Sequence, residues 1–313
     1  MKAIDIVGDV HGQSDEFESL LIKMGYKPFK QGFRHPDRKL IMVGDLIDGT
    51  GTANGQRRVL EIAKSMVDND DATVIMGNHE FNAICYATKM PDGNYARTHN
   101  EKNFKQHELF LEAFPFGSSE YWQAIRFFKE LPLWIDTPSF RVVHACWNDS
   151  AMKRLEHELD DENRLNSDKV FVRFGNEQQP LFDDLELILK GPEIKLPEGI
   201  SFKDKYGHIR TNARVRWWNA EHEQSKSLAV DDALQQKYDL AEAYQAASQY
   251  RYTSEVPVFF GHYWIAPEKI EEVSNSPAVC LDYSVARRGG KLVAIRLNNL
   301  FENSEWFSVQ RES

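Results

Sequence analysis

The sequence predicts an α/β fold in which helices cover a largely parallel β-sheet. Two observations lead to this prediction. Short apolar runs rich in β-branched residues recur at residues 3–7, 39–43 and 72–76, and a glycine follows each of them. Stretches with the helical spacing of apolar residues separate these runs. Strands that alternate with helices are typical of a parallel sheet covered by helices.

The predicted helices have recognisable start signals. Ser14 is the expected N-cap of a helix over residues 15–24, and Asn54 opens a second helix that ends near residue 67. A third helix is expected over residues 78–87, and the pattern from 91 to 130 is helical, with one helix starting at Ser119. Further helical runs lie near residues 150–159, 181–189 and 230–250.

Polar motifs directly follow the predicted strands. Residues 8–12 (GDVHG), 44–48 (GDLID) and 77–80 (GNHE) follow the first three runs, and two later apolar runs lead to His144 and His262. Because sites in open α/β sheets lie beyond the carboxyl ends of the strands, five strand ends are expected to converge. Their carboxylate, imidazole and amide donors suit manganese, iron or zinc. The candidate metal ligands are Asp9, His11, Asp45, Asn78, His144 and His262.

The order of these motifs resembles that of the calcineurin-like metallophosphoesterases, and within them the phosphoprotein phosphatase branch. That family carries GDxHG, GDxxDRG, GNHE, a histidine in an HA or HG pair and a late GH, and the matching positions here run from Gly8 to Tyr263. Bacterial protein phosphatases and diadenosine tetraphosphatases are the most similar groups. The resemblance implies an α+β sandwich of two central mixed β-sheets flanked by helices, with a dinuclear metal site at the strand ends.

The resemblance also implies a role for each motif residue. Asp9 and His11 would bind the first metal, and Asp45 would bridge the two metals. The second metal would be bound by Asn78, His144 and His262. Two metals about 3.5–4 Å apart can hold a bridging hydroxide that attacks phosphorus directly. His79 is the expected general acid, and Asp48 is the carboxylate expected to orient its imidazole.

One position departs from the family pattern. Gly49 stands where the phosphatases have an arginine that grips the phosphate oxygens. A glycine offers only a backbone amide, so Gly49 and its neighbours could supply N–H donors instead. A guanidinium from elsewhere is the alternative, with Arg214 and Arg216 as first candidates and Arg57 and Arg58 behind them.

Three functions fit these motifs. The leading one is a manganese-dependent phosphomonoesterase similar to protein serine/threonine phosphatases. The second is a nucleotide pyrophosphohydrolase or phosphodiesterase similar to the diadenosine tetraphosphatases. The third is a non-catalytic protein that binds metal or a phosphorylated ligand, for which Gly49 is the only support. The expected substrate is a phosphorylated small molecule, nucleotide or phosphoprotein.

Length, charge and cysteine content fit this assignment. We expect one catalytic domain over residues 1–313, because the ligands span most of the chain, with a mostly helical insert or cap at about residues 148–255. The net charge of −10 argues against a general binder of nucleic acid or anionic membranes. Three widely separated cysteines indicate a reducing compartment, and no signal peptide or membrane span is apparent, so a cytoplasmic location is expected. Cys146 and the pair Trp217 and Trp218 are more typical of core packing than of a reactive site.

Overall fold

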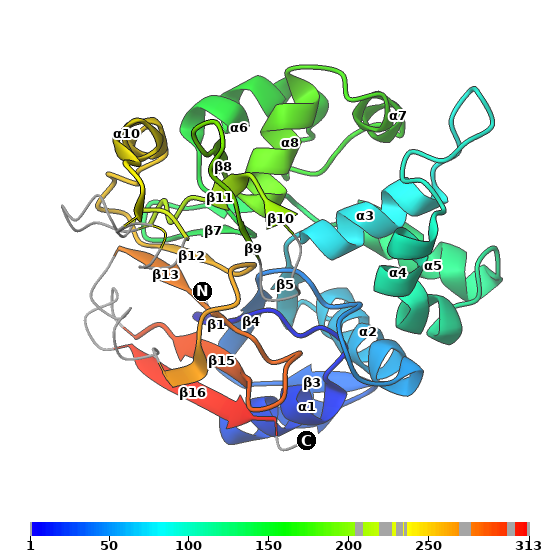
Figure 1. Ribbon diagram of the computed structural model, residues 1–313. Coiled ribbons are helices and arrows are strands. Elements are labelled where there is room, and N and C mark those ends of the chain that lie inside the picture. Colours follow the sequence, from blue (N-terminus) through cyan, green and yellow to red (C-terminus); the bar gives the residue numbers. More distant parts are fainter. Residues whose placement is uncertain are drawn as a thin grey trace.

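Two mixed β-sheets form the centre of the computed structural model, which describes residues 2–203, 209–218, 227–229, 234, 237–268, 277–298 and 304–311 (Figure 1). The first sheet has the order β14 (Asp282–Tyr283), β15 (Lys291–Arg296), β1 (Ala3–Val7), β4 (Arg38–Met42), β5 (Ala72–Val74), and β16 (Glu305–Gln310) also pairs with β15. The second has the order β13 (Ala278–Cys280), β12 (Val258–Phe260), β7 (Arg141–Val143), β6 (Trp134–Asp136).

Both sheets combine parallel and antiparallel pairs. In the first sheet, β1, β4 and β5 are parallel, whereas β15 runs antiparallel to β1. In the second, β12 is parallel to β7 and β13, and β6 is antiparallel to β7. The prediction of two mixed sheets is therefore confirmed, and β1, β4 and β5 form the parallel part expected from the alternation of strands and helices.

An apolar layer joins the two sheets. It includes Ile6 and Ile41 of the first sheet and Val142, Phe259 and Val279 of the second, all of them buried. Neighbouring strand residues point to opposite faces, so Val7 packs in the other, larger core instead. Close packing between the sheets fixes the relative position of the strand ends that carry the polar motifs.

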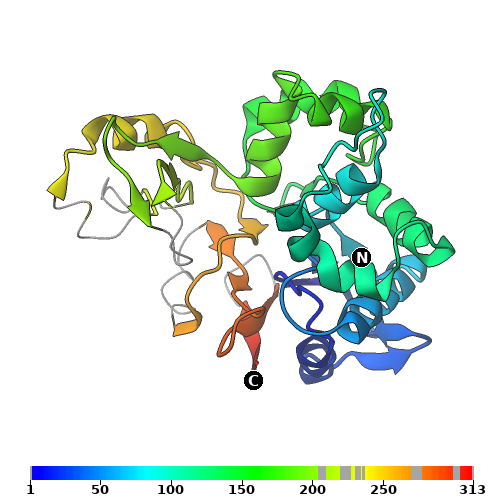
Figure 2. The same cartoon turned by 45° about the vertical axis from the view of Figure 1, so that its right-hand side comes forward.

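Helices cover the outer face of the first sheet. α1 (Ser14–Lys23) packs against β15 and β16, and α2 (Ala53–Asp68) packs against β5 and the small hairpin of β2 (Lys27–Phe29) and β3 (Gly32–Arg34). α3 (Asn78–Ala87), α4 (Glu101–Ala113) and α5 (Ser119–Lys129) gather with α2 on one side of the molecule (Figures 1 and 2). The helical prediction for residues 91–130 is confirmed over 101–113 and 119–129, whereas residues 91–100 form turns and an isolated bridge.

Two predicted helix starts are displaced by one or two residues. Ser14 lies inside α1, whose N-cap is Gln13, and the Ser14 hydroxyl donates to Asp15 instead of capping. The N-cap of α2 is Thr52, not Asn54, because the Thr52 Oγ1 accepts from the backbone N–H of Gly55 at 3.0 Å.

The predicted insert contains helices and short strands. Its helices are α6 (Asp149–Leu155), η1 (Glu156–Glu158), α7 (Lys169–Gly175), α8 (Leu181–Lys190) and α10 (Ala241–Ser248). Two small antiparallel pairs, which were not predicted from the sequence, join β8 (Glu193–Lys195) to β11 (Asn212–Arg214) and β9 (Phe202–Lys203) to β10 (Ile209–Arg210). α10 falls within the helical run predicted for 230–250, of which residues 230–233 and 235–236 lie outside the described residues.

The insert is tied to the end of β7. The backbone N–H of Ala145 donates to the Ile188 carbonyl of α8 at 3.1 Å, and the Trp217 indole donates to the Ala145 carbonyl at 2.8 Å. Trp217 is buried with its ring 4.6 Å from that of Phe260, which agrees with the prediction of core packing. The insert therefore contacts the residue that follows His144.

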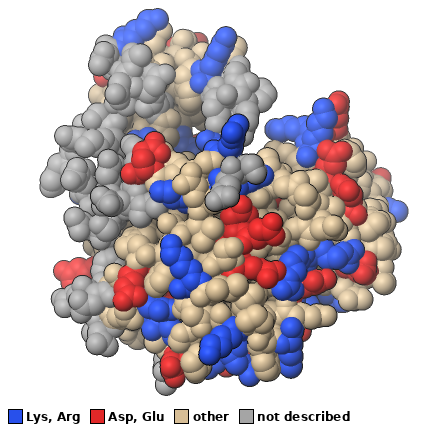
Figure 3. Space-filling view, turned by 90° about the horizontal axis from the view of Figure 1, so that it is seen from below, with Lys and Arg blue, Asp and Glu red and all other residues tan. Residues whose placement is uncertain are grey.

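The surface shown in Figure 3 carries Lys and Arg side chains interspersed with Asp and Glu. Of the helices that the structure describes, none has the length and apolar character needed to cross a bilayer.

Candidate metal centre

Several residues of the predicted site have left-handed backbone conformations. The φ angle is +49° at His11, +51° at Asp45, +64° at Asp48 and +71° at His262. Residues with side chains rarely adopt positive φ, and where they do the cost is usually accepted at functional sites. These turns follow β1, β4 and β12 and direct the polar side chains toward one another.

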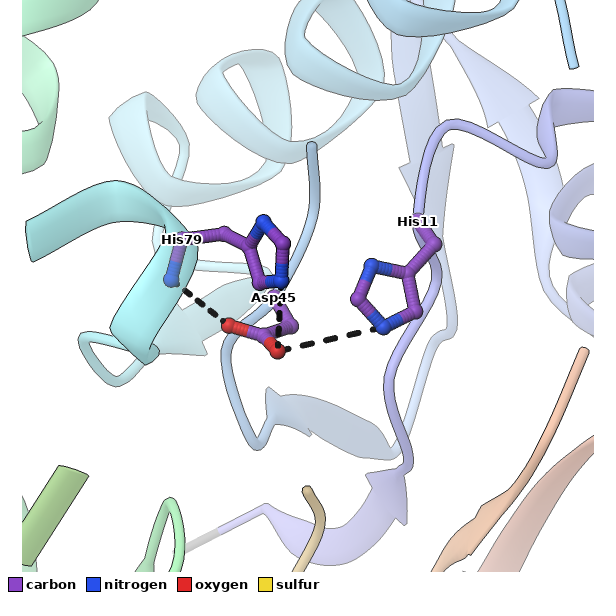
Figure 4. A group of neighbouring side chains, drawn as sticks. All are labelled: His11, Asp45 and His79. Carbon is purple, nitrogen blue, oxygen red and sulfur yellow. Dashed lines mark hydrogen bonds and ion pairs between the residues drawn. The ribbon is translucent and has the colours of Figure 1, made fainter. Parts of the chain in front are cut away.

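Asp45 lies at the middle of the site. Its Oδ2 is 3.8 Å from His11 Nε2 and 3.8 Å from His79 Nε2 (Figure 4). Its Oδ1 lies on the other side, 3.3 Å from His144 Nε2, and accepts the backbone N–H of His79 at 3.0 Å. The two oxygens of one buried carboxylate thus face two groups of side chains that could bind metal. This arrangement is the one that the predicted role of Asp45, bridging two metals, requires.

The other predicted ligands surround Asp45. Asn78 Oδ1 lies 3.1 Å from His144 Nε2 and 2.7 Å from His262 Nδ1. Asp9 Oδ2 accepts the backbone N–H of His262 at 2.9 Å and lies 4.0 Å from His11 Nε2. The structure brings together all six side chains predicted as metal ligands: Asp9, His11, Asp45, Asn78, His144 and His262.

Three buried atoms of this group suit cation binding. Asp9 Oδ1, His11 Nε2 and His262 Nε2 have no hydrogen-bond partner within the part of the chain that the structure describes. Buried polar atoms without partners are rare in folded proteins and require an explanation such as a bound ion. Two sets of side chains can each hold a cation: His11, Asp45 and His79, and Asp45, His144 and His262. The donor chemistry fits borderline divalent metals.

The electrostatics of the site reflect a dense group of buried charges. Burial raises the pKa of Asp9 well above its ordinary value, and the carboxylates of Asp282 and Asp45 raise it further. Burial opposes ionisation of Asp45 as well, but the imidazoles of His144 and His79 outweigh it and hold its pKa well below the ordinary range. Burial lowers the pKa of His144, yet Asp45 raises it to about 10. Metal binding would displace protons from such ligands.

His79 and Asp48 form the predicted pair. His79 Nδ1 lies 2.7 Å from Asp48 Oδ2, while the opposite ring nitrogen faces Asp45. Burial lowers the pKa of His79, but the Asp45 and Asp48 carboxylates outweigh this effect and raise it to about 9. An imidazole held in this way is positioned to give a proton from Nε2.

His107, which was not among the predicted site residues, contacts the same carboxylate. His107 Nδ1 lies 2.8 Å from Asp48 Oδ1, and its ring stacks on Phe110 at a centroid distance of 4.6 Å. The Gln56 side chain accepts the backbone N–H of Asp48 at 2.7 Å and donates to its carbonyl at 3.0 Å. The only signal in the sequence is a polar residue three positions before Phe110 on the apolar stripe of α4.

Glu80 also has a role that the sequence analysis did not assign. Its buried carboxylate accepts the backbone N–H groups of Asp45 at 2.9 Å, Leu46 at 2.8 Å and Gly77 at 3.0 Å. Glu80 therefore joins the loop after β4 to the loop after β5. A side chain at Gly77 would place its Cβ 2.3 Å from the Asp45 nitrogen, so this contact requires glycine.

The candidate phosphate-binding arginines differ in position. The guanidinium of Arg214, at the end of β11, is close enough to His262 to add to the effect of burial in lowering the pKa of that imidazole. The second-choice candidates are engaged elsewhere: Arg57 pairs with Glu120 at 3.0 Å, and Arg58 pairs with Glu18 at 2.6 Å. We therefore withdraw Arg57 and Arg58, whereas the roles of Gly49, Arg214 and Arg216 remain predictions.

Comparison with known proteins identifies the family. The model of the calcineurin-like phosphoesterases matches residues 2–223. The chain belongs to this family. Its members use divalent metal ions, which agrees with the donor groups around Asp45. The prediction from the motif order is thus confirmed.

Similar proteins include tetraphosphatases and phosphatases. The bis(5'-nucleosyl)-tetraphosphatase PrpE of Geobacillus sp. (strain WCH70) is 43% identical over 77 residues, and that of Halalkalibacterium halodurans is 38% identical over 76. These matches cover 24% of this chain and 30% of each relative. A putative diadenosine tetraphosphatase of known structure aligns over 99% of this chain and 93% of its own, with 18% identity and a TM-score of 0.47. A serine/threonine phosphatase from Saccharomyces cerevisiae aligns over 100% and 80%, with 12% identity and a TM-score of 0.46.

Proposed function

We propose that this protein is a metal-dependent phosphomonoesterase, similar in its chemistry to protein serine/threonine phosphatases, in which phosphorus is attacked directly. The arrangement around Asp45 carries this proposal. One carboxylate faces two groups of metal-ligand atoms, and the His79–Asp48 pair lies beside it. Such a site is suited to an in-line displacement at a phosphoryl group.

The proposed metal ligands divide between two cations. Asp9 and His11 would hold one, Asn78 and both late histidines, His144 and His262, would hold the other, and Asp45 would contact both. Manganese is the first choice, with iron and zinc as alternatives, because the donors are carboxylate, amide and imidazole. When bound, two such ions supply positive charge for the phosphoryl oxygens and lower the pKa of water.

The residues of the chain account for proton delivery. Asp48 fixes the His79 ring through Nδ1, so the proton on Nε2 is the one available for the leaving oxygen. The carboxylates of Asp45 and Asp48 raise the pKa of His79 to about 9 and so favour the protonated form that an acid catalyst needs. Asp48 is a positioning residue, because it acts through His79.

We further propose that residues 1–313 form one catalytic domain, in which the insert at about 148–255 is a cap over the site. The position of Arg214 supports this, since it brings a guanidinium of the insert near His262. The buried free thiols of Cys85, Cys146 and Cys280 support a location in the reducing cytoplasm.

Hydrolysis of a nucleotide anhydride is the second candidate. The tetraphosphatase relatives favour it, but their matches span about 77 residues, whereas the proposed metal ligands run from Asp9 to His262. The shared segment can contain only part of the proposed site. We therefore propose the monoesterase first, and the relative rates on monoester and diester substrates distinguish the two candidates.

Hydrolysis of nitrophenyl phosphate and of bis-nitrophenyl phosphate tests the proposal. Chelated protein is assayed before and after addition of manganese, with His79→Ala and Asp45→Asn as matched variants. Metal-dependent turnover of the monoester that falls at least a hundredfold in His79→Ala supports the phosphatase. Preference for the diester, or for diadenosine tetraphosphate in a parallel assay, supports nucleotide chemistry. Metal binding without turnover on any substrate would leave the non-catalytic binding protein.

A further inference from the structure

Position 49 cannot accommodate the arginine of the family pattern without a shift. Gly49 has a φ of +79°, and a Cβ built there would lie 2.9 Å from the Cβ of His11 and 3.2 Å from the Cβ of Ala286. His11 and Ala286 are both buried, so neither can move aside freely. A guanidinium for the phosphoryl group must therefore come from another element.

The loop at position 49 is bound to the turn between β14 and β15. The hydroxyl of Thr50 donates to the carbonyl of Ala286, and Arg311 Nη1 donates to the same carbonyl at 3.0 Å. Arg287 is the next residue, so the turn that contacts position 49 carries a different arginine.

The guanidinium of Arg287 lies on an aromatic ring that contacts a proposed metal ligand. Its Cζ is 4.4 Å from the centre of the Trp264 ring, and that ring lies 5.5 Å from the ring of His11. The backbone N–H of Trp264 donates to Asp282 Oδ2 at 2.7 Å, which holds this residue in a left-handed conformation with φ of +53°. The ring is thus a fixed platform, and a stacked guanidinium keeps its N–H groups available in the plane of the fork.

Arg287 has no carboxylate partner among the residues that the structure describes. By contrast, Arg38 and Arg296 pair with Asp5 at 2.7 and 3.1 Å. Arg287 is partly buried, whereas Arg288 beside it is exposed. A partly buried guanidinium that has no anionic partner among the described residues, and that stacks on a ring beside a proposed metal ligand, is suited to bind an anion.

We propose that Arg287 binds the non-bridging oxygens of the substrate's phosphoryl group and replaces, from the β14–β15 turn, the arginine that the family carries at position 49. This inference rests on the proposed phosphohydrolase function. Trp264 is the positioning residue that orients the guanidinium. The chemical class recognised is a terminal phosphate dianion, whose oxygens can accept two N–H bonds from one guanidinium.

Binding of inorganic phosphate to the manganese-loaded protein tests this assignment without turnover. The variants are Arg287→Ala and Arg287→Met, the second of which keeps an unbranched chain against Trp264, and the control is Arg288→Ala in the same turn. Isothermal titration calorimetry gives the Kd of phosphate, metal analysis gives the manganese content, and thermal unfolding checks the fold. In parallel, the inhibition constant of phosphate and the KM for nitrophenyl phosphate are measured.

Both Arg287 variants are expected to bind phosphate at least tenfold more weakly and to raise KM, with unchanged manganese content, while Arg288→Ala stays within twofold of the wild type. A Kd within twofold of the wild type in both variants would overturn the inference. So would an equal loss in Arg288→Ala, because a general charge effect would then explain it. If the wild type binds phosphate but hydrolyses no ester, the proposed function fails, and the calorimetry still decides the role of Arg287.

Discussion

Replacing His107 by leucine should slow catalysis by removing one of the two imidazoles that hold Asp48. The Asp48 carboxylate is 4% exposed, so water cannot easily replace the bond from His107 Nδ1 at 2.8 Å. Leucine keeps apolar volume next to Phe110, against which the imidazole stacks. The main loss is therefore one hydrogen bond to a charged group, which contributes about 1.5–3 kcal/mol.

That loss sets the expected size of the effect. If the lost hydrogen bond displaces His79 and raises the activation free energy by this amount, kcat should fall about tenfold to a hundredfold. Each 1.36 kcal/mol corresponds to a factor of about ten in rate. KM and manganese content should stay near their wild-type values, because His107 bonds to Asp48 and not to any of the proposed metal ligands. The assay is steady-state hydrolysis of nitrophenyl phosphate, together with metal analysis.

The matched control is His107→Asn. The amide nitrogen of asparagine, like Nδ1 of histidine, is bonded to Cγ, so it can still donate to Asp48 Oδ1. This variant should recover much of the lost kcat. A kcat of His107→Leu within twofold of the wild type, with His79→Ala inactive, would refute the reasoning, because His79 would then be held correctly by Asp48 without His107.

Three further predictions concern the surrounding structure. Glu80→Gln should lower the free energy of unfolding, measured by urea denaturation, by about 2–4 kcal/mol. An amide N–H of the glutamine would face a backbone N–H where the wild type has a carboxylate oxygen. Equal urea midpoints for the variant and the wild type would contradict this prediction. Gly49→Arg should destabilise the fold by about 1–2 kcal/mol and leave KM no better, since the positive φ and the contact with His11 oppose a side chain, whereas an improved KM would show that the site tolerates the family arginine. The third prediction concerns the buried cysteines: burial raises the pKa of Cys85 to about 12 and the pKa values of Cys146 and Cys280 well above the ordinary value. Ellman's reagent at pH 8 should therefore detect no thiol in the folded protein and three after unfolding. Reaction of a thiol in the folded protein would contradict this prediction.

The sequence by itself determined the family and the composition of the proposed metal centre. Each motif is local: an apolar strand ends, the chain turns, and a polar side chain follows within a few residues, as at Asp9, Asp45 and Asn78. The carboxyl ends of parallel strands meet at one edge of a sheet, so residues far apart in the chain could be assigned to one site before any contact was known. α3 was predicted with its observed bounds for a similar reason, because it starts at a motif.

Only the tertiary structure decided what surrounds this centre. His107 reaches Asp48 across 59 residues because α4 packs beside α2, and nothing in its local sequence distinguishes it from a core histidine. The strands β8 to β11 are two or three residues long, too short to show a periodicity. Ala286, in the turn that carries Arg287, lies beside Gly49 because the β14–β15 turn is bonded to Thr50. Motifs at strand ends depend on local backbone geometry, whereas these contacts depend on how separate elements pack, which no single stretch of sequence encodes.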